Sequence, residues 1–393
     1  MVYQIARRTR QSRPPARGRI AKAGTDAGTD AGMNRTLIVA GGAAALLVLR
    51  GAVRFMRGSW RGSLREKVVL IAGGSRGLGF LLAREFGRRG ARVAICARDR
   101  HELEEAKRQL AQDGIEVYAL TCDLSRREQV ERMVRTVVER FGHVDVLVNN
   151  ASVIAAGPLL DQRVEDFEQV MAVNFFSGLY ATMALLPHLL ARGGGRIVNI
   201  TSIGGKIAVP HLLTYSSAKF AAVGLSEGMR AELARYGIRV TTVAPGLMRT
   251  GSYLNTLIQG DRQAEFTWFA LADSLPITSM SARRAARQIT RATVRGDAEI
   301  VLTWQARAAA LLHGVFPGLM TDILALVNRM LPGPTGRGGE ARASGAASQT
   351  PLTQSFLTGL SQRAAAANNE LSATPGRLDA ELAQGVDEPV RPV

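Results

Sequence analysis

Short apolar runs alternate with longer amphipathic stretches through the middle of the chain. Seven runs have the length and composition of strands, at about 67–72, 92–97, 116–121, 144–148, 195–201, 238–243 and 298–302. Strands that read as almost continuously apolar are typical of parallel sheets buried on both faces. The stretches between them have apolar residues at helical spacing. The pattern therefore predicts an α/β fold, a doubly wound parallel sheet of about seven strands with helices on both faces.

The N-terminal region has a different pattern. Residues 1–35 form a basic, low-complexity leader, and Thr36–Leu49 is an uninterrupted run of 14 small and apolar residues that Gly51–Phe55 could extend. A membrane span needs about 20 residues, so the run is marginal. Basic residues after the run favour a cytoplasmic location for the rest of the chain. We expect residues 36–55 to be a membrane anchor helix, with a peripheral or partner-bound helix and a disordered extension as alternatives. We also expect the natural start at Met33.

The region after the last strand has two parts. Residues 305–331 are strongly apolar with few charges and contain Pro317. Core packing is the first interpretation of this segment, and a cap over a cleft, a subunit contact and a bilayer contact are the alternatives. Residues 332–393 are rich in Gly, Ala, Ser and Pro, which predicts a flexible tail with short helices at most, near Pro351–Leu371.

A glycine-rich loop follows the first strand. The strand Lys67–Ala72 leads into Gly73-Gly-Ser-Arg-Gly-Leu-Gly79, and a helix is predicted from Phe80 to Arg89. Glycines let a backbone turn tightly and approach a pyrophosphate, while a helix N-terminus offers amide donors and a favourable dipole. Taken alone, the loop is also compatible with a turn that binds nothing. Together with the strand pattern it predicts a Rossmann-type dinucleotide site.

A second constellation joins Tyr215, Lys219 and Ser202. Residues four apart lie on one face of a helix, so the Lys219 ammonium can sit near the Tyr215 phenol. A nearby cation favours phenolate and moves the tyrosine pKa from about 10 toward the working range. Ser202 ends a predicted buried strand, where its hydroxyl could bind the same substrate oxygen. The three groups predict proton exchange with an oxygen beside a bound nicotinamide.

Residues 64–304 resemble the short-chain dehydrogenase/reductase family, in which the glycine pattern is G-x-x-x-G-x-G. The resemblance implies a catalytic set of Asn174, Ser202, Tyr215 and Lys219. It implies cofactor contacts from Gly73, Ser75, Arg76, Gly77, Leu78, Gly79, Arg98, Asp123, Leu124, Asn150, Ala151, Tyr215, Lys219, Pro245, Gly246 and Thr250. One departure is clear. The family's Asn-Asn-Ala-Gly motif ends here in Ser152, which places a side chain close to the expected cofactor path.

The charge near the second strand bears on the choice of cofactor. An acid at the end of this strand binds the ribose hydroxyl of NAD, whereas a cation accommodates the 2′-phosphate of NADP. Here the strand ends at Ala97-Arg98, and Arg76 in the glycine loop is a second cation. NADP(H) is therefore favoured over NAD(H). Asp99 would be the ribose acid if the strand ended later.

The family likeness implies a reaction. Tyr215 would protonate a carbonyl oxygen held by Ser202, Lys219 would bind the nicotinamide ribose and lower the tyrosine pKa, and Asn174 would hold a relay water. We therefore expect an NADP(H)-dependent oxidoreductase with reversible hydride transfer between nicotinamide and a ketone or secondary alcohol. A non-catalytic NADPH-binding sensor or scaffold is the alternative. The family also implies a homodimer or tetramer built on long helices at about 163–190 and 214–236.

The predicted substrate lid, residues 247–282, is apolar. It contains Tyr253, Leu254, Leu257, Phe266, Trp268, Phe269 and Leu271. These side chains favour a hydrophobic or lipid-like substrate, although they could equally cover the sheet.

Charge and cysteine content narrow the possible partners. The net charge of +17 does not indicate nucleic-acid binding, because residues 1–67 hold 14 basic against 3 acidic residues and the remainder 36 against 30. No aromatic residues interleave with the basic ones. Cys96 and Cys122 are expected to be buried free thiols in the cytoplasm. The 5 histidines form no metal-binding pattern, so no metal is expected.

Overall fold

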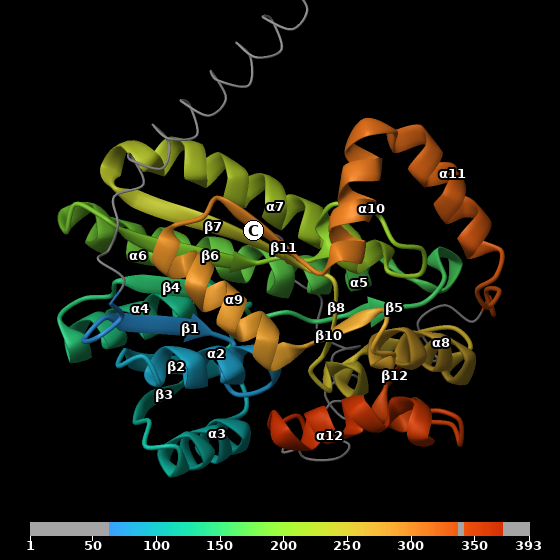
Figure 1. Cartoon of the computed structure of the whole chain (residues 1–393), viewed down its shortest axis with the longest axis horizontal. Helices are drawn as coiled ribbons and strands as arrows, with labels where there is room; N and C mark the ends of the chain where they lie inside the picture. The colour runs from blue at the N-terminus through green and yellow to red at the C-terminus, as the bar shows by residue number, and fades with distance from the viewer. Residues whose placement is uncertain (1–62, 337–341, 372–393) are drawn as a thin grey trace, which may run out of the picture. The chain divides into compact units, whose positions relative to one another are not determined.

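A computed structural model describes residues 63–336 and 342–371, the coloured parts of Figure 1. The expected leader, the anchor helix at 36–55 and the start at Met33 lie outside the described residues. The domain boundaries at 64–304 and 305–331 fall within them.

Seven parallel strands form the central sheet, as the sequence predicts. They are β1 (Val68–Ala72), β2 (Arg92–Ala97), β3 (Val117–Thr121), β4 (Val146–Asn149), β6 (Gly195–Ile200), β7 (Ile238–Pro245) and β11 (Glu299–Leu302). Their order is β11-β7-β6-β4-β1-β2-β3. The chain builds outward from β1 to β3 and then returns to place β4 on the other side of β1. The carboxyl ends of β1 and β4 therefore mark the point at which such sheets bind ligands.

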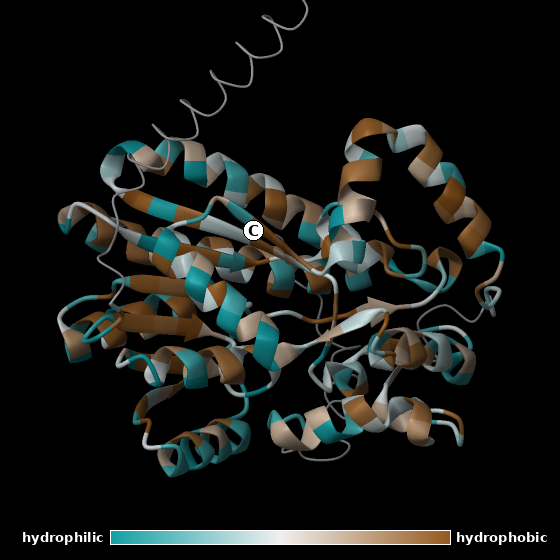
Figure 2. Cartoon of the chain, in the orientation of Figure 1, coloured by the Kyte–Doolittle hydropathy of each residue, from teal (hydrophilic) through white to brown (hydrophobic). Residues whose placement is uncertain are grey.

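Helices cover both faces of this sheet. On one face lie α2 (Gly77–Gly87), α3 (Arg100–Gln112) and α9 (Ala282–Arg295), and on the other α4 (Arg127–Phe141), α6 (Ser177–Ala191) and α7 (Leu213–Leu233). Successive side chains of a strand point to opposite faces, so Val69 and Ile71 pack with the first set and Val68 and Leu70 with the second. Figure 2 shows the resulting apolar strands between amphipathic helices.

Helix α5 (Val164–Met171) continues through a π-helical turn, Ala172–Phe176, into α6. The combined helix, Val164–Ala191, is long and apolar enough to cross a membrane, yet 33% of its most apolar window is buried within the domain. Its contacts with α4 and α7 make it part of the α/β domain. A π-turn of this kind often marks a functional site, and here it carries Asn174.

Short elements after β4 and β7 form a smaller layer that strand periodicity does not predict. They are β5 (Ala155–Ala156), β8 (Leu247–Arg249), the 3₁₀ turn Ser252–Asn255, β9 (Leu257–Ile258), α8 (Arg262–Ser274) and β10 (Ser279–Ser281). Strand β8 pairs with β10, and β9 pairs with β5. This layer stands at the carboxyl edge of the central sheet, because β5 follows β4 and β8 follows β7.

The apolar segment after β11 does not pack into the core. It forms α10 (Trp304–Val315) and α11 (Pro317–Asn328), in which only Ala306 and Met320 are buried. The exposed apolar side chains of this hairpin are Trp304, Leu311, Val315, Phe316, Leu319, Ile323, Leu326, Val327 and Met330. Figure 1 shows the hairpin projecting from the sheet, and Figure 2 shows that much of its ribbon has the colour of hydrophobic residues. Core packing, the first interpretation of the sequence, is wrong because no element covers these two helices within the described residues.

Residues 342–371 fold back onto the domain, where composition predicts a flexible tail. Strand β12 (Ala343–Ser344) pairs antiparallel with β9, and helix α12 (Gly359–Ala367) contacts α8. Ser361 and Ala365 are fully buried in this contact. The predicted short helix near 351–371 is thus part of a packed structure.

Candidate active site

The glycine loop has the backbone shape that a dinucleotide site requires. Gly73 and Gly77 have φ values of +86° and +56°, which side-chain-bearing residues rarely adopt. A Cβ at Gly79 would lie 1.9 Å from the carbonyl oxygen of Gly73, so only glycine fits there. The loop ends at the N-terminus of α2, whose first amides have no partner within the helix. This shape and these donors fit a pyrophosphate.

Asn150 and Ala151 support the loop from β4. The side-chain amide of Asn150 donates to the Gly73 carbonyl at 2.6 Å, and Ala151 packs so closely that a Cβ on Gly73 would lie 2.8 Å from its Cα. Asp123 and Leu124 follow β3 at the same edge of the sheet. The Asp123 carboxylate accepts from the backbone and hydroxyl of Ser125, and Leu124 is buried.

Tyr215 lies in the first turn of α7, where two serine hydroxyls act on its phenol. One is Ser202, which the sequence places beside the same substrate oxygen, and the other is Ser152, the departure from the family motif. Burial raises the pKa of Tyr215, and both serine hydrogen bonds lower it. Ser202 also accepts from the Gly204 amide at 3.0 Å, which fixes its rotamer. The contact between Ser152 and Tyr215 is absent from the sequence prediction, which placed Ser152 only near the cofactor path.

Lys219 lies one turn after Tyr215 and is almost completely buried. Its Nζ is 5.6 Å from the centre of the Tyr215 ring and donates to the Ile200 carbonyl at 3.2 Å. Burial lowers the pKa of Lys219 to about 7. The ammonium is therefore a weaker cation at neutral pH than the sequence alone suggests, and the downward influences on the Tyr215 pKa come from the serines.

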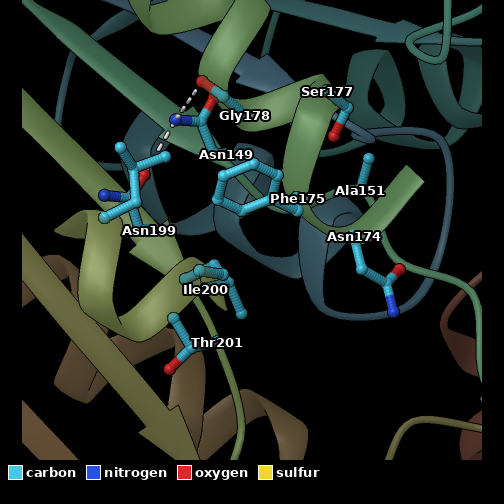
Figure 3. Close-up of a pocket in the computed structure, with 11 residues that line it drawn as sticks. Asn149, Ala151, Asn174, Phe175, Ser177, Gly178, Asn199, Ile200 and Thr201 are labelled. Atoms are coloured by element: carbon cyan, nitrogen blue, oxygen red, sulfur yellow. Dashed lines mark hydrogen bonds between the residues drawn. The ribbon is translucent and has the colours of Figure 1, made fainter. Parts of the chain in front are cut away.

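Asn174 holds the loop that carries Ser152. Its amide accepts from the Val153 backbone N–H at 2.8 Å and donates to the Val153 carbonyl at 2.9 Å. Because Val153 follows Ser152 directly, this double hydrogen bond holds the backbone that carries Ser152. Asn174 also lines a small pocket between the ends of β4 and β6 and the helices α6 and α7. Figure 3 shows its amide turned away from Phe175, and Asn149 donating to Asn199 and Gly178 at the other end of the pocket.

Comparison with known proteins identifies the family to which the chain belongs. The family model for short chain dehydrogenase matches residues 67–257. The dehydrogenase/reductase SDR family member 7B of Danio rerio is 32% identical over 297 residues, which cover 73% of this chain and 93% of the relative.

The chain belongs to the short-chain dehydrogenase/reductase family.

Two further similar proteins are ketoreductases by name. A putative ketoacyl reductase of Streptomyces coelicolor is 39% identical over 187 residues, 47% of this chain and 72% of that protein. The crystal structure of an actinorhodin polyketide ketoreductase with NADPH is 30% identical, with a TM-score of 0.55 over 60% of this chain and 95% of that one. As a short-chain dehydrogenase/reductase, the chain is an oxidoreductase that acts on CH–OH or C=O groups with a nicotinamide cofactor.

Charged groups surround the glycine loop of this short-chain dehydrogenase/reductase. Arg76 pairs with Glu102 at 3.1 Å, and the Ser75 hydroxyl donates to the same buried carboxylate at 2.9 Å. Arg98 is exposed directly after β2. Asp99 caps helix α3 by accepting from the amides of His101 and Glu102. The strand therefore ends at Ala97, as the sequence predicts, and Glu102 is a site residue that the sequence patterns do not reveal.

Pro245 ends β7, and Gly246 and Thr250 follow it at the carboxyl edge, in the loop that the sequence predicts to cover the nicotinamide. The Gly246 amide donates to the Leu302 carbonyl at 3.2 Å, and a Cβ on Gly246 would lie 2.6 Å from the Thr303 hydroxyl. Thr250 is buried and donates to the Ser252 hydroxyl at 2.7 Å.

The aromatic lid residues pack mainly on one another. Tyr253, Phe266 and Phe269 are buried in one cluster, with Leu254, Trp268 and Tyr215 packed against it. The sequence left two interpretations of the lid, a substrate pocket and a hydrophobic cover, and the cover describes these three side chains. Leu254 and Trp268 are half-buried and pack against the cluster together with Tyr215.

A buried polar cluster ties the lid to the start of α7. His211 Nδ1 lies 2.8 Å from a carboxylate oxygen of Glu265, whose other oxygen accepts from the Trp268 indole at 2.7 Å. His211 stands four residues before Tyr215, so the cluster fixes the lid helix α8 relative to the catalytic helix. Histidine and glutamate were not singled out from the sequence, since their contact spans 54 positions.

Proposed function

We propose that this protein is an NADP(H)-dependent reductase of ketones, reversible toward secondary alcohols, with an apolar, lipid-like substrate. The observation that carries the proposal is the buried Tyr215 phenol, whose pKa two serine hydroxyls lower, one turn before a buried lysine. The bound cofactor would supply the hydride. The glycine loop and the α2 amides would hold its pyrophosphate, and Asn150 and Ala151 would support that loop.

The side chains have separate roles in this reaction. A carbonyl oxygen placed beside Tyr215 and Ser202 accepts a hydrogen bond from each. As negative charge develops on that oxygen, the Tyr215 phenol transfers its proton to it. Ser152 stabilises the phenolate that remains, while Ser202 keeps its hydrogen bond to the substrate oxygen. Lys219 lies one turn away as a cation for the nicotinamide ribose. Asn174 acts by position, because it fixes the backbone that carries Ser152.

Tyr215→Phe tests this mechanism. The variant keeps the ring and its packing but has no proton to give, so we expect turnover to fall at least about a thousandfold with NADPH affinity nearly unchanged. The control is Tyr236→Phe, an exposed tyrosine just after α7. Retained turnover in Tyr215→Phe would refute the assignment. NADPH binding by the wild-type chain without turnover of any ketone would favour a non-catalytic sensor or scaffold.

The preference for NADP(H) rests on charge. Arg76 lies in the glycine loop and Arg98 follows β2, while Asp99, the acid next to Arg98, is engaged in capping α3. Arg76→Ala should weaken NADPH binding about tenfold or more and leave NADH binding almost unchanged. Arg88→Ala, at the far end of α2, is the matched control. Equal losses for both cofactors in Arg76→Ala would show that Arg76 does not contact the 2′-phosphate.

Membrane association is the second part of the proposal. The exposed apolar hairpin α10–α11 supports it, together with the apolar run expected at 36–55. We place the catalytic domain on the cytoplasmic side of the membrane, where its substrate would reach it from the bilayer. A helix that exposes apolar residues along its length is suited to the boundary of a bilayer.

A homodimer or tetramer is the third part. Exposed apolar residues on the long helices α6 and α7 support it, among them Met183, Leu190 and Phe220.

Two variants separate these surfaces. Leu326→Glu on α11 should reduce flotation with phospholipid vesicles and leave the oligomeric state unchanged. Met183→Glu on α6 should leave flotation unchanged and disrupt the oligomer, as measured by light scattering after gel filtration. Each variant is the control for the other. Unchanged flotation in Leu326→Glu would show that the hairpin is not needed for membrane association.

A further inference from the structure

The C-terminal segment, residues 359–371, lies against the glycine loop. It consists of α12 and the four residues after it, and Figure 1 shows α12 beside α3 and α8. Ala365 packs on the loop after β8, where a Cβ on Gly251 would lie 2.4 Å from the Ala365 Cα. Asn368, Asn369 and Glu370 are each less than 5% exposed. The end of the segment is therefore buried within the candidate cofactor site.

The segment makes hydrogen bonds on both sides of this site. The Asn368 carbonyl accepts from the Gly77 amide at 2.8 Å, and its side chain donates to the Thr250 carbonyl at 3.0 Å. The Asn369 amide donates to the carbonyls of Ser75 and Glu102 at 2.8 and 3.0 Å. Asn369 adopts φ +61°, a conformation that asparagine tolerates better than most residues. The segment therefore joins the glycine loop to the loop expected to cover the nicotinamide.

Glu370 places a carboxyl group at the N-terminus of α2. One of its oxygens lies 2.4 Å from where a Cβ on Gly77 would stand, and the other accepts from Asn255 at 2.8 Å and lies 3.6 Å from the Arg76 guanidinium. Helix N-termini and arginines are the groups that bind phosphate. Burial raises the pKa of Glu370 to about 7. The charge of Glu102 raises this pKa as well, whereas Arg76 and the hydrogen bond from Asn255 lower it.

We propose that the C-terminal segment is an internal ligand of the glycine loop, and that a dinucleotide binds only after the segment has left. The segment and a dinucleotide would compete for the same groups, which are the Gly77 amide, Arg76 and the Thr250 loop. This inference rests on the proposed function, because it takes the glycine loop to be a dinucleotide site.

The base of the segment is anchored independently. Strand β12 pairs with β9, and Arg342 forms a 3.1 Å ion pair with the fully buried Asp166. Residues 359–371 can therefore leave while residues 342–345 stay paired. A tethered segment competes at a high effective concentration, so modest affinity is enough to exclude a cofactor.

The first test is hydrogen exchange on the full-length chain. We expect saturating NADPH to accelerate exchange in residues 360–371 and to leave residues 343–345 protected. A segment that keeps its protection while NADPH is bound would overturn the proposal.

The second test is a matched pair of full-length variants. Ala365→Asp places a charge in the buried contact, whereas Ala366→Asp places the same charge on the exposed side of α12. While the segment occupies the site, NADPH can bind only the fraction of molecules from which the segment has left. The apparent Kd for NADPH is then the intrinsic Kd divided by that fraction, so releasing the segment lowers the apparent Kd. We expect NADPH to bind Ala365→Asp at least about fivefold more tightly than Ala366→Asp or wild type, as measured by fluorescence titration.

The outcomes of the titration are distinct. Equal NADPH affinity in all three chains would overturn the internal ligand and leave the proposed function intact. No binding of NADPH or NADH to any of them, with fold confirmed by circular dichroism, would refute the cofactor site and the internal ligand together.

Discussion

The hydroxyl of Ser152 lowers the pKa of the Tyr215 phenol from a position that is glycine in the family's Asn-Asn-Ala-Gly motif. The tyrosine therefore has two serine partners, and both lower its pKa against the effect of burial. A hydroxyl that donates to the phenolate stabilises the form left after proton transfer. The departure from the motif thus adds a hydroxyl that lowers the pKa of Tyr215.

Ser152→Gly should weaken the acidity of Tyr215. Removing one donor to the phenolate raises the tyrosine pKa, so the alkaline rise in alcohol oxidation should move to higher pH by up to about one unit, a factor of about ten in acidity. Ser152→Ala should behave alike, because the hydroxyl and not the Cβ is responsible. The pH profile of kcat for oxidation measures the effect. An unchanged profile in both variants would remove Ser152 from the proton-transfer step.

Lys219 should make stability depend on pH. Burial lowers its pKa from 10.5 to about 7, so between these values the unfolded chain holds a proton that the folded chain has released. Stability from this site is therefore lowest below pH 7 and increases as pH rises toward 10.5. Urea unfolding should show that the free energy of unfolding of the wild type increases relative to that of Lys219→Met as the pH rises from 6.5 to 9. A constant difference would mean that Lys219 stays protonated when folded.

The Glu265 cluster should contribute strongly to stability. Glu265→Ala leaves the buried His211 ring and the Trp268 N–H without their acceptor, so we expect a loss of about 2–4 kcal/mol in the free energy of unfolding. Glu232→Ala, at an exposed site near the end of α7, should change it by less than about 0.5 kcal/mol. Similar small losses for both variants in urea titrations would show that water replaces the acceptor.

The two cysteines should react slowly in the folded protein. Burial raises the pKa of Cys96 to about 12 and that of Cys122 to about 11. At pH 8 both remain thiols, and the thiolate is the reactive form. Ellman's reagent should therefore detect almost no fast thiol in the native chain and two after denaturation with guanidinium. A rapid native reaction would show that one strand edge opens readily.

The sequence predicts the central sheet and much of the site because both depend on local patterns. Strands β1 to β3 have bounds within one residue of those predicted, since a buried strand must be apolar throughout. The glycine loop and the Tyr215–Lys219 pair are fixed by residues only a few positions apart.

The features that the sequence does not predict depend on contacts across long separations. Glu102 meets the glycine loop across 27 positions at Ser75, and Asn369 meets Ser75 across 294. Composition makes residues 332–393 resemble a disordered tail, because its small and polar residues give no amphipathic signal. The exposure of α10–α11 likewise depends on where the rest of the chain packs, because no other described element covers these helices. Such contacts arise from tertiary packing and have no local signature.

Strand β12 has a consequence for how the protein can be shortened. It covers β9, whose other side pairs with β5. Deleting the chain from residue 343 onward would remove this cover and leave an unpaired strand edge, which is a template for intermolecular pairing and aggregation. Deletion after residue 345 would keep the edge covered while removing α12. The two truncations differ by only a few residues, yet the first should yield insoluble protein and the second a soluble one.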